Sequence, residues 1–148
     1  MDIAKFRIGK EENLFRAWIE KTKEMRVIHS FENETNILRS AVLNYWDHPD
    51  EETAKIKGYV SKVFQKECIL MQYTPFKDTK KEKLCEGDIT KNKYGVKHVI
   101  GKRDGAFCLL SLSGELAVWF CMNGGQKFVD ENEIKKIGTV FENSDLLK

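Results

Sequence analysis

Residues 96–125 read VKHVIGKRDGAFCLLSLSGELAVWFCMNGG, and they contain the most regular series of turn signals in the chain. Its turn signals are Asp104-Gly105, Ser113-Gly114 and Asn123-Gly124-Gly125, which follow one another at intervals of nine and ten residues. Asp-Gly and Asn-Gly pairs tolerate the positive φ angles of tight hairpin turns, and this spacing is typical of a small barrel or sandwich. The stretch therefore predicts an antiparallel meander with strands at residues 96–102, 106–112 and 115–122.

The meander is expected to continue toward the C-terminus with strands at residues 126–129 and 134–141. The strand at 106–112 is apolar on both faces, which predicts a central position in the sheet. In the last strand Ile137, Thr139 and Phe141 share one face, and the mixed character of the other face indicates an edge or half-exposed strand. The predicted fold class is mainly β (α+β), a small antiparallel β-barrel that is partly open.

The N-terminal part predicts a further hairpin, in which residues 15–20 and 25–28 flank the polar turn at residues 21–24. Residues 68–73 are predicted to form another strand, and the polar stretch at residues 78–83 an exposed turn.

Apolar residues in the middle of the chain recur with helical spacing. From Ile37 to Trp46 they fall at i, i+1, i+4, i+5, i+8 and i+9, which places them on one side of a helix that Asn33 or Thr35 would cap. Pro49 and the acidic residues 50–52 suit the start of a second helix, which would continue to residue 64. We therefore predict a helical insertion at about residues 34–66, inside a single domain that covers residues 1–148.

Length and composition indicate an ordinary globular protein. The chain has 148 residues, of which 41% are hydrophobic and 32% charged, which fits one domain and not a disordered chain. The longest apolar run, at residues 116–122, has seven residues, against roughly twenty needed to cross a bilayer. The N-terminus lacks the apolar stretch of a secretory signal. We expect a cytoplasmic protein without membrane contact.

The reactive side chains form no catalytic or metal-binding motif. Cys68, Cys85, Cys108 and Cys121 lie 17, 23 and 13 positions apart, whereas zinc sites usually build on a close pair of cysteines. Each lies in or beside an apolar stretch, so buried, reduced thiols are expected. The three histidines lie far apart, and none neighbours a nucleophile in a recognised arrangement. We expect no enzyme activity, no catalytic residue, no metal and no cofactor.

The net charge of +2 is too small for bulk attraction to nucleic acid or anionic lipid. The charges are unevenly distributed, because residues 77–103 include nine basic and four acidic residues, whereas residues 104–148 include four basic and seven acidic ones. A solvated, polarised surface explains this pattern. Opposite charges on one small domain could also guide self-association.

The basic segment carries an alternative hypothesis. Small β-barrels bind single-stranded nucleic acid by combining a basic groove with aromatic side chains on which bases stack. The residues that would form such a surface are Tyr73, Lys91, Lys93, Tyr94 and Lys97.

Three segments, spread over both ends and the middle of the chain, carry recognisable motifs. The first is LFRAW at residues 14–18, followed by Met25. The second is LMQYT at residues 70–74, followed by Lys77-Asp78 and by EGDI at residues 86–89, and the third is IGTVFEN at residues 137–143, followed by Leu146-Leu147. In this order and spacing the three segments resemble the YopX family of small bacteriophage and prophage proteins. The motif residues singled out are Phe15, Arg16, Trp18, Gln72, Tyr73, Gly87, Asp88, Gly138, Glu142 and Asn143.

The chain departs from the family pattern at Pro75, where the family usually has glycine, and residues 31–67 do not obviously match it. The resemblance implies a largely β fold in a phage-derived protein of the bacterial cytoplasm, and it brings no catalytic residues. Structural roles account for the motif residues themselves. The main functional hypothesis is a non-enzymatic interaction or scaffold protein, which forms a homo-oligomer or binds a host or phage protein.

Overall fold

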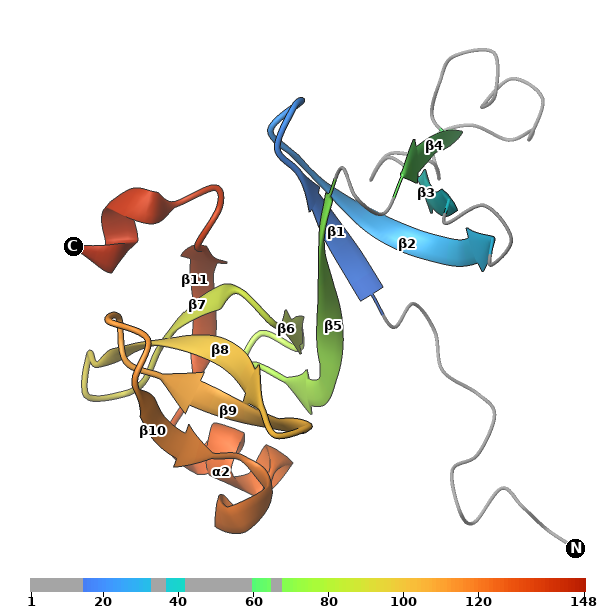
Figure 1. Ribbon diagram of the computed structural model, residues 1–148. Coiled ribbons are helices and arrows are strands. Elements are labelled where there is room, and N and C mark those ends of the chain that lie inside the picture. Colours follow the sequence, from blue (N-terminus) through green and yellow to red (C-terminus); the bar gives the residue numbers. More distant parts are fainter. Residues whose placement is uncertain (1–14, 33–36, 42–59, 65–67) are drawn as a thin grey trace, which may run out of the picture. The chain divides into compact units, whose positions relative to one another are not determined.

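The computed structural model describes residues 15–32, 37–41, 60–64 and 68–148 (Figure 1). They form two compact units that divide between Leu70 and Met71. The strands pair antiparallel throughout the described registers, which confirms the mainly β fold class. The boundary of a single domain at residues 1–148 stays a prediction.

The first unit is a sheet with the strand order β4-β3-β2-β1. Its strands are β1 (Phe15–Ile19), β2 (Glu24–Glu32), β3 (Ile37–Ala41) and β4 (Val60–Phe64), and β5 (Cys68–Lys77) begins in this unit and ends in the second. The predicted N-terminal hairpin is confirmed as β1 and β2, with Trp18 opposite Met25. Ala17 and Ile28 are buried together at the centre of its small apolar cluster.

The predicted helical insertion is wrong at two places that the structure describes. Residues 37–41 and 60–64 form β3 and β4, which pair from Ile37 opposite Phe64 to Ala41 opposite Val60. Short apolar runs fit a buried strand as well as a helix, and the presence of a pairing partner decides between them. The rest of the predicted insertion, including both proposed N-caps, lies outside the described residues.

The second unit contains a sheet with the order β10-β9-β8-β7-β11, which curls into a half-barrel, and a short strand β6 that pairs with β5. Its elements are β6 (Lys83–Cys85), β7 (Asp88–Lys91), β8 (Lys97–Arg103), β9 (Ala106–Leu110), β10 (Leu116–Trp119), η4 (Cys121–Asn123), α2 (Gln126–Glu131), β11 (Lys135–Thr139) and η5 (Ser144–Leu147). The predicted strands at 106–112, 115–122 and 134–141 are confirmed with shorter bounds, and the one at 96–102 is confirmed with a shift of one residue. The central position of β9 and the edge position of β11 are confirmed as well.

The predicted strand at residues 126–129 is wrong, because these residues open helix α2. Gly124 and Gly125 adopt positive φ angles of 99° and 61° and turn the chain into this helix and not into a hairpin. The neighbouring side chains Phe128 and Val129 both pack with the core around buried Phe120. Adjacent residues of a strand point to opposite faces, whereas one helix face can hold both, so core packing favours the helix.

The core of the second unit is centred on Phe120. Its ring lies 5.1 Å from that of Phe76 and 6.2 Å from that of Phe128, in tilted and edge-on arrangements that aromatic pairs prefer. The buried residues of this cluster come from β6, β8, β9, α2 and the segments beside them, and they are Leu84, Ile100, Leu109, Phe120, Val129 and Ile134.

A buried carboxylate fixes the start of β11. Asp78 is 1% exposed, and its Oδ1 accepts hydrogen bonds from the backbone N–H groups of Lys80 and Glu82 at 2.8 and 2.9 Å. Its Oδ2 accepts a third from the N–H of Lys136 at 3.0 Å. The predicted turn at residues 78–83 is therefore exposed except for Asp78, whose side chain joins that turn to β11.

Replacing Asp78 with Ala is expected to lower the free energy of unfolding by about 3 kcal/mol, because three backbone donors lose a charged acceptor. Urea unfolding followed by circular dichroism measures the change. The exposed Asp145→Ala should stay within about 0.5 kcal/mol of the parent. An equally small loss for Asp78→Ala would contradict the role given to its carboxylate.

Candidate functional site

The β7–β8 turn, residues 92–96, is a compact loop organised by one side chain. The Asn92 Oδ1 accepts hydrogen bonds from the N–H groups of Tyr94 and Val96, each at 3.0 Å. Its backbone N–H donates to the Val96 carbonyl, and Gly95, with a φ of 82°, donates to the Asn92 carbonyl. The loop is therefore ordered by its own bonds, and Tyr94 stands on it with 74% of its surface exposed.

Three lysines lie in register across the strands beside this loop. Lys91 of β7 is paired with Lys97 of β8 on one side and with Lys135 of β11 on the other. Directly opposite residues of antiparallel strands have Cβ atoms about 5 Å apart, and like charges at such positions destabilise the sheet. We call Lys97, Lys91 and Lys135 the lysine row. It places three positive charges on one sheet face at a cost in stability.

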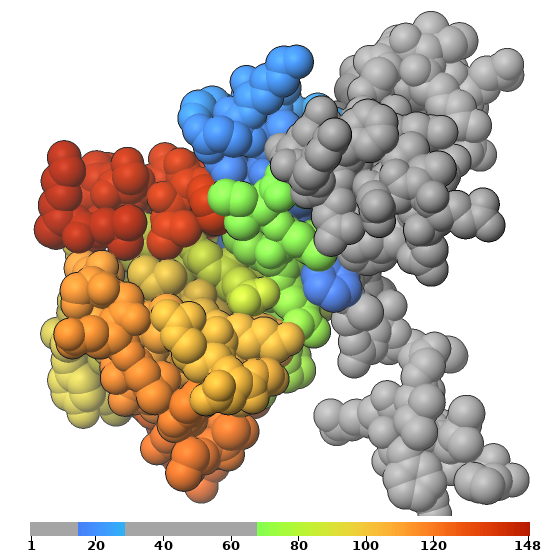
Figure 2. Space-filling view, in the orientation of Figure 1, coloured from blue at the N-terminus to red at the C-terminus, as the bar shows by residue number. Residues whose placement is uncertain are grey.

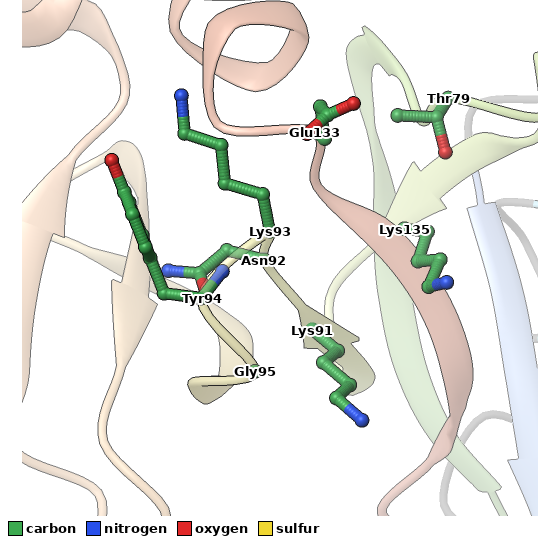
Figure 3. A pocket seen from close by; sticks show the side chains of 8 residues that line it. All are labelled: Thr79, Lys91, Asn92, Lys93, Tyr94, Gly95, Glu133 and Lys135. Carbon is green, nitrogen blue, oxygen red and sulfur yellow. The ribbon is translucent and has the colours of Figure 1, made fainter.

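The lysine row adjoins an open cavity of about 550 Å³. Lys91 at the end of β7 and residues 92–95 of the loop form part of its wall, and the remaining lining residues are Thr79, Glu133 and Lys135. Figure 3 shows the Lys91 and Lys135 side chains extending in the same general direction from neighbouring strands. Tyr94 and Lys93 extend from the other side of the loop (Figure 3). The cavity thus presents ammonium groups together with one exposed aromatic ring.

The ammonium groups differ in what they already contact. The Lys93 Nζ donates to the Glu131 carbonyl at 2.8 Å and lies 5.3 Å from the centre of the Tyr94 ring. The Lys97 Nζ donates at 3.2 Å to the carbonyl of Leu146, in the C-terminal segment on the surface of the second unit (Figure 2). Neither Lys91 nor Lys135 has an ion pair with any residue that the structure describes. These two lysines are the ones most available to a ligand.

Two neighbouring groups modify the electrostatics of the cavity. Glu133 is exposed on its wall and adopts a φ of 49°, a left-handed conformation that is uncommon outside glycine. Burial lowers the pKa of His98, next to Lys97 in β8, so this imidazole is neutral at pH 7 and adds no charge to the row. The cavity therefore holds several cations and a single carboxylate.

Of the five residues predicted for nucleic-acid binding, Lys91, Lys93 and Tyr94 line the cavity. Lys97 is the neighbour of Lys91 in the row. Tyr73 does not line the cavity, since it lies in β5 opposite Cys85, half-buried, with the Lys83 Nζ 5.7 Å from its ring centre. The sequence places four of these residues within seven positions, and the fold keeps those four together.

Sequence reasoning missed five of the lining residues, namely Thr79, Asn92, Gly95, Glu133 and Lys135. Asn92 and Lys135 carried a signal, since Asn is a turn former and Lys135 is the second residue of the last predicted strand, residues 134–141. The pairing of that strand with β7 could not be predicted from the sequence.

The motif residues of β5 and β7 make structural contacts. The Gln72 N–H donates to the Glu86 carboxylate at 2.7 Å. Gly87, at a φ of 83°, bonds to Ile100 and Val140 through its backbone, and a Cβ there would meet the Met71 sulfur at 3.0 Å. Asp88 is fully buried, where its carboxylate accepts from the Cys85 N–H and lies 3.4 Å from the Lys136 ammonium. These contacts join β5, β7, β8 and β11.

The remaining motif residues lie at the two ends of the described chain. A Cβ on Gly138 would meet the Asn143 Oδ1 at 2.6 Å, and that oxygen accepts from the Thr139 N–H. The Thr139 hydroxyl donates to the Glu142 carboxylate, which closes the turn after β11. In β1, Phe15 is half-buried, while Arg16 and Trp18 are buried.

The described cysteines are free thiols, but they are not uniformly buried. Cys85 and Cys108 are buried as predicted, Cys68 is half-buried, and Cys121 is exposed, which contradicts the prediction. The reason is local, since Cys121 follows the buried Phe120 into η4 and points away from the core that Phe120 fills. Within the described residues, His, Cys, Asp and Glu form no group of three that could hold a metal ion.

Comparisons with known proteins agree with this fold. A family model described as YopX protein matches residues 14–148, which confirms the resemblance seen in the sequence. The crystal structure of protein EF1440 from Enterococcus faecalis matches with a TM-score of 0.55 at 22% identity, over 91% of this chain and 97% of that chain. At this identity the likeness shows the fold alone. None of the curated proteins matches, and no helix in the described ranges is long and apolar enough to cross a membrane.

Replacing Lys91 with Thr is expected to raise the free energy of unfolding by about 0.5 kcal/mol at low salt, because it removes the repulsion from both neighbours of the row. The gain should shrink between about 0.01 M and about 1 M salt, as the Debye length falls from about 30 Å to about 3 Å. Urea unfolding at both salt concentrations measures it. Arg103→Thr is the control, because Arg103 is paired with the uncharged Ala106. A salt-independent gain, or a loss of stability, would contradict the proposed repulsion.

Proposed function

This chain belongs to the YopX family, and from that premise we propose that it is a non-enzymatic interaction protein that binds an anionic host or phage macromolecule through the cavity beside the lysine row. The observation that carries the proposal is the register of Lys97, Lys91 and Lys135. Three like charges in adjacent strands oppose folding, and a bound anion would offset that repulsion. The bacterial cytoplasm and the phage setting are part of the proposal.

The chemistry of the cavity supports binding over catalysis. Many acid–base catalysts use two titratable groups with separated pKa values, and Glu133 is the single carboxylate among the residues that line the cavity. Nucleophilic catalysis needs an activated side chain, and burial raises the pKa of the Cys108 thiol and so keeps it protonated. Exposed ammonium groups and a tyrosine ring are groups that hold a ligand.

The edges of the sheet are poorer candidates for binding a partner than the cavity is. β10, at one edge, has four residues and a register shift between Leu116 and Val118. β11, at the other edge, begins with Lys135 and Lys136 and has a register shift before Gly138. Short edge strands, bulges and edge lysines are the features by which natural sheets discourage pairing with another chain. The cavity is therefore the better candidate for the binding surface.

The cavity proposal is tested by chromatography on immobilised heparin, a polyanion without bases. The native protein is expected to bind at low salt and to elute as salt rises, since surface charge attraction is screened. Lys91→Glu/Lys135→Glu should elute clearly earlier. Arg103→Glu/Lys127→Glu, which makes the same change in net charge away from the cavity, should elute close to the native protein. Equal shifts for both double variants would contradict a local site.

Self-association is a second candidate, favoured by exposed apolar side chains. Leu116 is 47% and Met122 is 77% exposed, and both lie between β9 and α2 in sequence. The basic excess at residues 77–103 and the acidic excess at residues 104–148 supply complementary charges for a second copy.

If copies associate through this surface, sedimentation velocity at about 50 μM should show a dimer or larger species. Leu116→Ser/Met122→Ser should then sediment as a monomer, whereas Ile69→Ser, which removes an exposed apolar residue of the first unit, should not change the species. A monomer for the native protein would exclude this candidate and leave the cavity proposal standing.

A further inference from the structure

We infer that the cavity binds single-stranded nucleic acid, with phosphates along the lysine row and a base stacked on Tyr94. This inference rests on the proposed function, because it names the anionic macromolecule that the cavity takes. Two features support it together: the lysines in register on neighbouring strands, and the exposed Tyr94 ring on the loop beside them. No single structural role explains both features.

The lysine row suits a chain of phosphates. Adjacent strands lie about 4.8 Å apart, so three strands space the lysines over roughly 10 Å. Each ammonium group can neutralise one phosphate, so a row of three lysines can contact up to three phosphates of a strand. Lys91 and Lys135 have no competing ion pair among the described residues, and Lys97 donates to a neutral carbonyl that a phosphate can replace.

Tyr94 suits a base. Its side chain is the most exposed aromatic ring of the described chain, at 74%, and the bonds of Asn92 hold its loop in place. Lys93 lies 5.3 Å from the ring centre and directs its ammonium toward that ring. Sequence-tolerant single-strand binding combines an aromatic face with cations that follow the backbone. Because the loop is already ordered, little conformational entropy is lost on stacking.

Two observations favour a single strand over other polyanions. An acidic peptide or a sulfated sugar has charges to match the lysines but no flat ring to stack on Tyr94. Glu133, on the cavity wall, repels additional anions there, whereas an unpaired base offers N–H donors, such as the N3–H of thymine, from which its carboxylate can accept. A duplex keeps its bases stacked on one another, so Tyr94 would find no free base face.

The test is fluorescence anisotropy of a labelled 12-nucleotide oligo-dT at low salt. Native protein is expected to bind it, and the slope of log affinity against log salt should be about −2, the value for three phosphates of a single strand. Tyr94→Ala should weaken binding by about tenfold, while Tyr94→Phe should keep it. Lys91→Glu/Lys135→Glu should abolish binding, and the charge-matched Arg103→Glu/Lys127→Glu should retain it.

Heparin binding distinguishes a failure of the single-strand inference from a failure of the proposed interaction function. If heparin is bound through Lys91 and Lys135 but oligo-dT is not, or if Tyr94→Ala leaves oligo-dT binding unchanged, the single-strand inference is overturned and the interaction function stands. Tighter binding of a 12-base-pair duplex than of oligo-dT would overturn it as well. If the native protein binds neither heparin nor oligo-dT, both proposals fail. Thermal unfolding of each variant checks that it is folded.

Discussion

The register of β11 on β7 is the constraint on which the rest of the second unit depends. At one end the buried Asp78 carboxylate holds the Lys136 N–H, and at the other the Asn143 side chain holds the Thr139 N–H. A slip of one residue would move every β11 side chain to the opposite face of the sheet. It would also remove Lys136 from the buried Asp88 carboxylate. The same register places Lys135 opposite Lys91.

The cavity combines a rigid frame with an unfavourable charge arrangement. Its loop is held by the side chain of Asn92, and β7, which leads into that loop, includes the buried residues Ile89 and Thr90. On this frame the lysine row brings together charges that repel one another. Conflicts between local preference and the fold are expected at functional sites, where the stability lost is compensated elsewhere. Here the compensation comes from the Phe120 core and the bonds of Asp78.

The confirmed predictions rest on local signals that the tertiary structure did not oppose. Asp104-Gly105 makes the predicted β8–β9 hairpin with both residues at positive φ, because the turn chemistry and the flanking strands favour the same structure. The failures at residues 37–41, 60–64 and 126–129 have the opposite origin. There the apolar spacing suited two structures, and the choice was made by a partner strand for β3 and β4 and by packing on Phe120 for α2.

The family and the mainly β class could be predicted from the sequence, and so could four members of the candidate site. Those four, Lys91, Lys93, Tyr94 and Lys97, lie within one hairpin and need no distant partner to come together. Tertiary structure alone decided that Tyr73 lies apart from them and that Lys135 and Glu133 join them. Glu133 and Lys135 lie about 40 positions after the hairpin in sequence. Their placement follows from strand pairing between remote segments, which depends on long-range hydrogen bonds and buried contacts that no local pattern encodes.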